Sequence, residues 1–220
     1  MRNILIVAGG VVAVAAIAAG VWFGTRPSSP AVAPQAVAQT ADKTTLLQVQ
    51  PTDHVLGDPK APITLIEYAS LTCPHCAAFD KEMLPQIKTD WIDTGKAKLV
   101  FRDYPLDGSA LKAAIVARCA PPERFYGFID ILFAQQASWG LSPDPVPGIA
   151  RIAKLGGMSE DQVQACLKDD ALQNKILAGR LTAEKDYKVE STPTFFINGK
   201  RVVGARSDEI LDALKAASKT

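Results

Sequence analysis

A Cys-x-x-Cys pattern, Cys73-Pro74-His75-Cys76, lies between a predicted strand and a predicted helix. The strand is predicted over residues 63–68, which are mostly apolar and include β-branched side chains. The helix is predicted just after the first cysteine, because apolar residues recur there at helical spacing and Pro74 suits a first helical turn. This order predicts an α/β fold with a cysteine pair at a helix N-terminus.

Two cysteines in this setting suit electron exchange. The reactive species is the thiolate, and the unpaired N–H groups and positive dipole at a helix N-terminus lower the pKa of Cys73. His75, when protonated, would add a further positive charge. Cys76 is spaced to close a disulfide with Cys73, so we predict Cys73 as the nucleophile and Cys76 as the resolving cysteine. Stronger stabilisation of the thiolate makes the disulfide a stronger oxidant.

A Cys-x-x-Cys pattern can also serve two structural roles. Half of a zinc site is one, but the remaining cysteines are at 119 and 166 and the two histidines at 54 and 75, so the ligands would have to converge from scattered elements. A structural disulfide is the second, but closing so small a ring gains little stability. We therefore expect no metal and no dissociable cofactor besides the redox-active Cys73–Cys76 disulfide.

The N-terminal residues determine the expected location. Ile4–Gly24 is an uncharged apolar run, long enough to cross a bilayer core of roughly 30 Å. We interpret residues 1–24 as a membrane anchor. The alternative is a cleaved signal sequence and a soluble protein, because small residues at 31–33 and 36–38 suit a signal peptidase. Both alternatives indicate export to a compartment where disulfides persist.

Composition excludes several classes of protein. The chain has 24 Lys and Arg against 23 Asp and Glu, and this balance argues against binding to nucleic acid. The hydrophobic content of 48% excludes wholesale disorder. Residues 25–44 are rich in Pro, Ala and Ser, and we interpret them as a linker. The remaining part, about 175 residues, is long enough for a substantial core.

Beyond the cysteine pair, the pattern alternates between strands and helices. Further strands are predicted over 96–104, 191–197 and 201–204. Residues 109–186 are predicted to be helical, with a capping box at Ser159 and Gln162. Asn198-Gly199 predicts a hairpin turn, and Ser207 is expected to cap a last helix.

Residues 67–76 (Glu-Tyr-Ala-Ser-Leu-Thr-Cys-Pro-His-Cys) and 191–199 (Ser-Thr-Pro-Thr-Phe-Phe-Ile-Asn-Gly) resemble the DsbA-like branch of the thioredoxin superfamily. The resemblance covers nearly all of the chain after the linker. It implies a thioredoxin fold with a helical domain inserted between the second and third strands. The expected boundaries are 45–107 and 188–220 for the two parts of the thioredoxin fold, and 108–187 for the helical insertion.

The resemblance also implies further site residues. Pro193, with Thr192 before it, corresponds to a cis-proline whose neighbouring backbone would bind an extended peptide, the alternative being an ordinary trans proline. Glu67 corresponds to a buried acid that could exchange a proton with Cys76. The alternative for Glu67 is a salt bridge at the edge of a strand.

Cys119 and Cys166 lie on apolar faces of predicted helices, where buried free cysteines are common. The resemblance implies that they form the additional structural disulfide found in some members of the family. Closing a loop of about 48 residues would stabilise the fold by roughly 4 kcal/mol in the loop-entropy model.

The resemblance implies a thiol:disulfide oxidoreductase, and we expect an oxidase that donates the Cys73–Cys76 disulfide to unfolded exported proteins with free cysteines. A membrane quinone-linked partner would reoxidise the protein, which we expect to be a monomer in the periplasm, tethered by residues 4–24. One alternative is a disulfide isomerase or reductase on the same fold. A second alternative is a peptide-binding chaperone that exposes the phenylalanines of 125–133 and 195–196.

Overall fold

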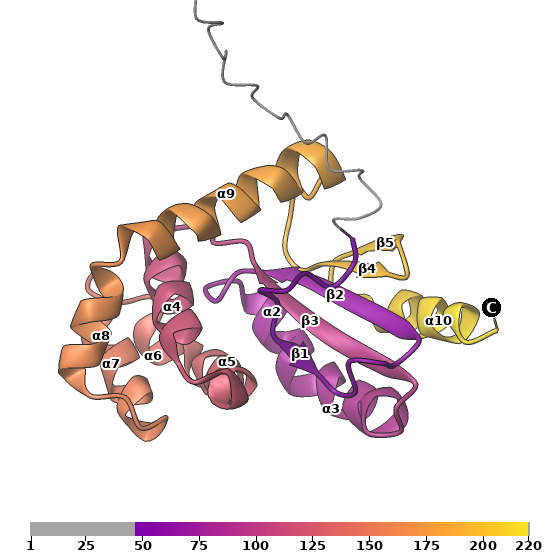
Figure 1. The fold of residues 1–220 in the computed structure, drawn as a ribbon, viewed down its shortest axis with the longest axis horizontal. Helices are drawn as coiled ribbons and strands as arrows, with labels where there is room; N and C mark the ends of the chain where they lie inside the picture. Colours follow the sequence, from indigo (N-terminus) through magenta and orange to yellow (C-terminus); the bar gives the residue numbers. More distant parts are fainter. Residues whose placement is uncertain (1–46, 220) are drawn as a thin grey trace, which may run out of the picture. The chain divides into compact units, whose positions relative to one another are not determined.

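The computed structural model describes residues 47–219 (Figure 1). The predicted membrane anchor at 4–24 and the predicted linker at 25–44 lie outside this range. Within residues 47–219, no helix is both long enough and apolar enough to cross a membrane.

A five-stranded mixed sheet lies at the centre of the fold. The strands are β1 (Val55–Leu56), β2 (Ile63–Ala69), β3 (Ala97–Asp103), β4 (Thr194–Ile197) and β5 (Lys200–Val203), in the order β1-β3-β2-β4-β5. Strands β2 and β3 are parallel, and the other neighbouring pairs are antiparallel. The predicted thioredoxin fold with a helical insertion is confirmed. The two-residue strand β1 was not predicted, and it places the insertion between β3 and β4.

Helices connect the strands and build the insertion. Between β2 and β3 lie α2 (Pro74–Ala78), η1 (Phe79–Met83), α3 (Leu84–Ile87) and η2 (Lys88–Ile92), where η1 and η2 are π-helical turns. The insertion contains α4 (Gly108–Cys119), the 3₁₀ turn η3 (Pro122–Arg124), α5 (Phe125–Ala134), α6 (Gln136–Trp139), α7 (Val146–Leu155), α8 (Glu160–Leu167) and α9 (Asp170–Tyr187). After β5 the chain ends in α10 (Ser207–Ala217).

The two faces of the sheet are covered by different helices, as Figure 1 shows. On one face Leu65 and Phe195 pack with Phe79 and with Ile210 and other residues of α10. On the opposite face the alternate residues pack against α9, and they include Ile66, Tyr68, Val100 and Phe196. This division follows from the two-residue period of a strand, which sends neighbouring side chains to opposite faces.

The insertion has its own apolar core, which extends to the cysteine pair. Phe125, Phe128 and Leu132 of α5 are buried in the same cluster as Cys73 and Cys76. The helical insertion therefore packs directly against the segment that carries the two thiols.

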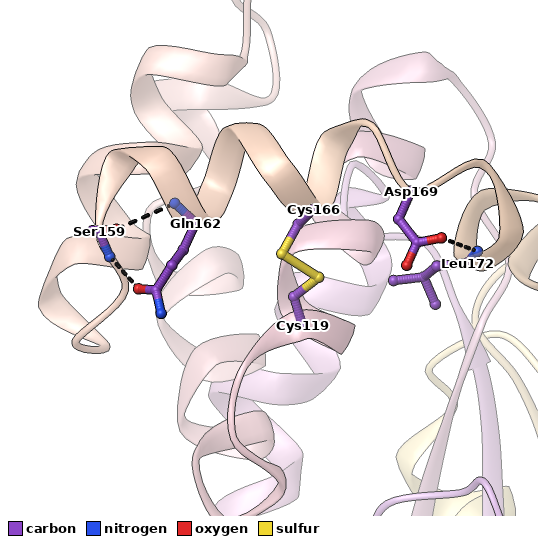
Figure 2. The surroundings of a disulfide bond; sticks show 6 residues. All are labelled: Cys119, Ser159, Gln162, Cys166, Asp169 and Leu172. Carbon is purple, nitrogen blue, oxygen red and sulfur yellow. Dashed lines mark hydrogen bonds between the residues drawn. A yellow bond between two sulfur atoms is a disulfide. The ribbon is translucent and has the colours of Figure 1, made fainter.

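Local predictions at turns and helix ends can be compared with the structure. Ser159 and Gln162 form the predicted capping box, with Ser159 Oγ accepting from the Gln162 N–H at 3.2 Å (Figure 2). Asn198 and Gly199 both have positive φ, as a two-residue hairpin turn requires. The prediction for Ser207 was wrong, because α10 begins at Ser207 itself and Arg206 occupies the cap position without a side-chain cap bond. An ion pair of 2.6 Å between Arg206 and Glu209 crosses this first turn instead.

Candidate active site

Cys73 lies at the point where the loop after β2 becomes α2. Its backbone is extended, with φ −78° and ψ 120°, and Pro74 occupies the first helical turn, where no N–H is needed. The Cys73 N–H donates to the Ser70 carbonyl at 3.0 Å and closes the preceding turn. Cys73 and Cys76 are free thiols and both are buried, whereas Pro74 and His75 between them are exposed.

The surroundings of the Cys73 sulfur favour the thiolate. Its pKa is lowered to about 5, chiefly by a hydrogen bond from the Cys76 thiol. The nearby Thr192 side chain and the backbone N–H groups of Cys76 and His75 lower the pKa further, while burial opposes them. At neutral pH Cys73 is therefore ionised and suited to attack or to leave a disulfide.

Cys76 has the opposite character. Burial raises its pKa, and the hydrogen bond that it donates to Cys73 and the nearby charge of Glu67 raise it further. Cys76 therefore stays protonated while Cys73 ionises. This difference between the two thiols matches the predicted nucleophile and resolving cysteine.

Glu67 lies on the central strand β2, where its neighbours across the sheet are Phe101 and Phe195. Its side chain is buried, and Oε1 has no hydrogen-bond partner in the part of the chain that is described. Burial raises its pKa well above the usual range, and the charges of Asp80 and Cys73 add to the effect. No ion pair within residues 47–219 involves Glu67, which argues against the salt-bridge alternative.

Thr192 and Pro193 face the cysteine pair from the far end of the chain. The bond between them is cis, and Cys73 in its protonated form donates to the Thr192 carbonyl at 3.3 Å. The Thr192 hydroxyl is buried and has no hydrogen-bond partner among the described residues. The folded chain thus brings Thr192 and Pro193 to the sulfur, as the resemblance implied.

The structure adds two residues that the sequence analysis did not single out. Gln136, at the start of α6, donates to the carbonyls of Leu71 and Cys73. Asp107, before α4, accepts a hydrogen bond from Thr72. An Asp preceding a helical pattern is a recognisable cap, so Asp107 had a local signal. Gln136 had none, because its contacts depend on how the insertion packs.

Cys119 and Cys166 are joined by a disulfide, with their Cα atoms 6.2 Å apart. Figure 2 shows that the bond links the C-terminal end of α4 to α8. These sulfurs are therefore not available to a zinc site with Cys73 and Cys76. Across residues 47–219, no group of three or more His, Cys, Asp or Glu side chains could hold a metal ion.

Two cysteines at the start of a helix, after the central strand of a mixed sheet and opposite the cis Thr192–Pro193 bond, define a protein of the thioredoxin class. The comparison with protein families agrees, since the family described as Thioredoxin matches residues 49–216. The chain belongs to the thioredoxin family.

Individual proteins that are similar to this chain include protein-disulfide oxidoreductases. A putative protein-disulfide oxidoreductase of Rickettsia typhi is 34% identical over 166 residues, which are 75% of this chain and 62% of that protein. The disulfide bond formation protein D of Bacillus subtilis is 27% identical over 177 residues, which cover 75% of this chain and 77% of that protein. The chain thus spans less than two thirds of the Rickettsia relative.

Among solved structures, alpha-DsbA1 of Wolbachia pipientis is similar, with a TM-score of 0.75 and 32% sequence identity. The match covers 81% of this chain and 96% of that chain. The resemblance to the DsbA-like branch is therefore confirmed.

Proposed function

We propose that the protein is a thiol:disulfide oxidoreductase of the DsbA type that works as an oxidase. The observation that carries this proposal is the unequal environment of the two thiols. Hydrogen-bond donors surround Cys73, and Cys76 is buried beside it. A site that stabilises the thiolate of its reduced form makes the corresponding disulfide readily reducible, and hence a good oxidant of other thiols.

The proposed reaction starts from the Cys73–Cys76 disulfide. A substrate thiolate attacks Cys73 Sγ, a substrate–enzyme disulfide forms, and the Cys73–Cys76 bond breaks. The electron pair of that bond leaves on Cys76, which then takes up a proton. A second substrate thiolate attacks the substrate sulfur and releases Cys73 as a thiolate. The substrate has lost two electrons and gained a disulfide, and the enzyme has gained the two electrons.

Three residues are proposed to assist this reaction. Glu67 is buried and carries a raised pKa, so its carboxyl group can supply the proton that Cys76 takes up. Thr192 lies against Cys73, and Thr192 and Pro193 immediately precede β4, where their backbone can bind an extended substrate peptide. We propose no metal and no dissociable cofactor for the reaction.

The substrates and partners remain part of the proposal. We propose unfolded exported proteins with free cysteines as substrates, and a membrane quinone-linked protein as the reoxidant. We also propose that the protein is a periplasmic monomer, tethered to the inner membrane by residues 4–24. The apolar N-terminal run supports the tether. Fractionation with protease accessibility tests the location, because a tethered periplasmic domain stays with the membrane and is digested only after the outer membrane is opened.

A redox titration tests the direction of electron flow. The full-length protein, in mild detergent, is equilibrated with glutathione buffers, and its free thiols are trapped and identified by mass spectrometry. An oxidase keeps Cys73 and Cys76 reduced until the buffer is strongly oxidising, while Cys119 and Cys166 stay bonded. A pair that is as hard to reduce as that of thioredoxin would instead support the isomerase or reductase alternative.

A second comparison tests the chaperone alternative. The phenylalanines that such a protein would expose, among them Phe125, Phe128, Phe195 and Phe196, are at most 4% exposed. Replacing Cys73 and Cys76 together by serine removes an oxidase activity completely. A chaperone would keep its ability to prevent aggregation of an unfolded, cysteine-free protein.

A further inference from the structure

Two side chains, one in the helical insertion and one at the residue just before it, hold the loop that ends at Cys73. The Gln136 Nε2 group donates two hydrogen bonds, to the carbonyl oxygens of Leu71 at 2.8 Å and of Cys73 at 3.0 Å. Asp107 Oδ2 accepts a hydrogen bond of 2.6 Å from the Thr72 hydroxyl. Three successive residues are therefore held by the insertion and the residue that precedes it, through groups other than the two cysteines.

Both side chains are themselves anchored in regular structure. Asp107 Oδ1 accepts from the Ala110 N–H at 2.8 Å, so the same carboxylate caps α4. Gln136 begins α6, which ends at the fully buried Trp139, whose indole N–H donates to the Leu132 carbonyl at 2.9 Å. Groups held in this way can keep a neighbouring loop in one geometry.

The carbonyl of Cys73 connects these contacts to the thiol. It accepts from the Ala77 N–H at 3.2 Å, a bond of the first turn of α2, and the Gln136 amide uses its remaining acceptor capacity. The first turn of α2 also contains the N–H groups of His75 and Cys76 that face the Cys73 sulfur. Because they belong to the same helical turn, a change in the orientation of the Cys73 carbonyl also changes the direction in which those N–H groups point.

We propose that Gln136 and Asp107 are positioning residues, which strengthen the stabilisation of the Cys73 thiolate by holding residues 71–73 against the first turn of α2. The inference rests on the proposed function, because thiol–disulfide exchange is the reaction that it tunes. Without these bonds the turn can rotate, and its N–H groups align less well with the sulfur. The thiolate depends on that alignment more than the neutral thiol does, so the oxidising power of the site falls.

The test uses two substitutions in the full-length protein. Gln136→Leu removes both donors at similar volume, and Thr72→Val removes the hydroxyl while leaving Asp107 to cap α4. The absorbance of the reduced protein at 240 nm is followed against pH to titrate the Cys73 thiolate. We expect each variant to raise the Cys73 pKa by about half a unit to one unit, a three- to tenfold lower ratio of thiolate to thiol. The equilibrium with glutathione should shift in the less oxidising direction by a similar factor.

Gln135→Leu is the matched control, because it makes the same change one residue earlier. We expect it to titrate like the unaltered protein. The inference is overturned if Gln136→Leu and Thr72→Val titrate like the unaltered protein, or if Gln135→Leu shifts the titration equally. If one variant fails to fold, as judged by circular dichroism, the other decides the result.

The experiment also separates this inference from the proposed function. If the unaltered Cys73 titrates near 8.5 and its disulfide is not readily reduced by glutathione, the proposed oxidase function fails. If the unaltered protein behaves as an oxidase and the variants match it, only the positioning role fails.

Discussion

Cys73 and Cys76 are chemically identical residues that the fold makes unequal. Cys73 faces hydrogen-bond donors at the start of a helix, and Cys76 lies one turn further on, fully buried. The difference arises within one helical turn, so it depends on local backbone geometry and on few neighbours. Substitutions of single residues are therefore the sharpest probes of it.

The first prediction concerns the reactivity of Cys73. Because its pKa is lowered to about 5, alkylation of the reduced protein by iodoacetamide should reach its full rate by about pH 6–7. An ordinary thiol, with a pKa of about 8.5, would still be gaining reactivity there. Quenched samples analysed by mass spectrometry measure the rate at Cys73, and Cys73→Ser gives the background. A rate that keeps rising to pH 9 contradicts the prediction.

The second prediction concerns Glu67. Its folded-state pKa is raised above the unfolded value of about 4.3, so the folded protein holds this proton more tightly than the unfolded chain does. The contribution of Glu67 to stability is therefore lost as the pH rises above about 4.3. The Glu67→Gln variant has no carboxyl group to titrate at this position and should not lose this stability. The free energy of unfolding of the variant, minus that of the unaltered protein, should therefore be larger at pH 8 than at pH 4.

Urea titrations of the oxidised protein at the two pH values measure this difference. The oxidised form is used because the Cys73 thiol does not titrate in it. If the difference between Glu67→Gln and the unaltered protein is the same at pH 4 and pH 8, Glu67 does not bind its proton in the way described.

At the scale of elements, α4 connects the active-site loop to the rest of the insertion. Asp107 caps its first turn and binds Thr72, and Cys119 at its last turn is bonded to Cys166 of α8. Its twelve residues extend about 18 Å at the rise of an α-helix. The two ends of α4 can be altered separately.

The third prediction compares two helix caps. Asp107→Ala and Asp169→Ala each remove a carboxylate that accepts a backbone N–H, at α4 and at α9 respectively. Each should lower the free energy of unfolding by about 1 kcal/mol in urea titrations. Asp107→Ala should also raise the Cys73 pKa, because the bond to Thr72 is lost with the cap, whereas Asp169→Ala should leave it unchanged. An equal effect of both variants on Cys73 would contradict this distinction.

The fourth prediction concerns the disulfide of the insertion. Cys119 and Cys166 are separated by 47 positions, so cross-linking them removes much freedom from the unfolded chain. Replacing both by alanine should lower the free energy of unfolding by about 2–4 kcal/mol. Urea titration measures the loss, and thiol counting under denaturing conditions verifies that both cysteines are gone. An unchanged unfolding midpoint would show that the bond does not constrain the unfolded state.

At the scale of the whole molecule, the redox state of one pair of sulfur atoms should alter the stability of the fold. The folded pKa of Cys73 lies near 5 and that of an unfolded cysteine near 8.5. The thiolate therefore contributes stability to the reduced protein that is complete above about pH 8.5 and is lost as the pH falls to about 5.

The fifth prediction follows from this linkage. The reduced protein should unfold at a higher temperature than the oxidised protein at pH 8, and the difference should shrink at pH 5. Differential scanning calorimetry of both forms tests the prediction, with thiols counted before and after each scan. If the oxidised form is the more stable at pH 8, the thiolate is not what the fold stabilises.

Much of this molecule could be predicted from local sequence patterns. The strands, the hairpin at Asn198-Gly199 and the capping box at Ser159 depend on neighbours within a few residues, and the structure agrees with them, except that the strand predicted from residue 191 begins at Thr194, after the cis Thr192–Pro193 bond. Strand β1 has only two residues, too few to show the alternation of apolar and polar residues by which a strand is recognised in a sequence. Gln136 reaches Leu71 from 65 positions away, a contact that follows from packing rather than from any local pattern.

The site combines sequence segments that lie far apart. Cys73 and the Thr192 carbonyl that it meets are separated by 119 positions, and the whole helical insertion lies between them. A ribosome makes chains from the N-terminus, so Cys119 and Cys166 both exist before Thr192 does. A growing chain that ends before β4 contains the two thiols but not the proline loop that faces them. In a chain that is exported while it is being made, this order gives the insertion an opportunity to close its own disulfide before the molecule possesses a finished site.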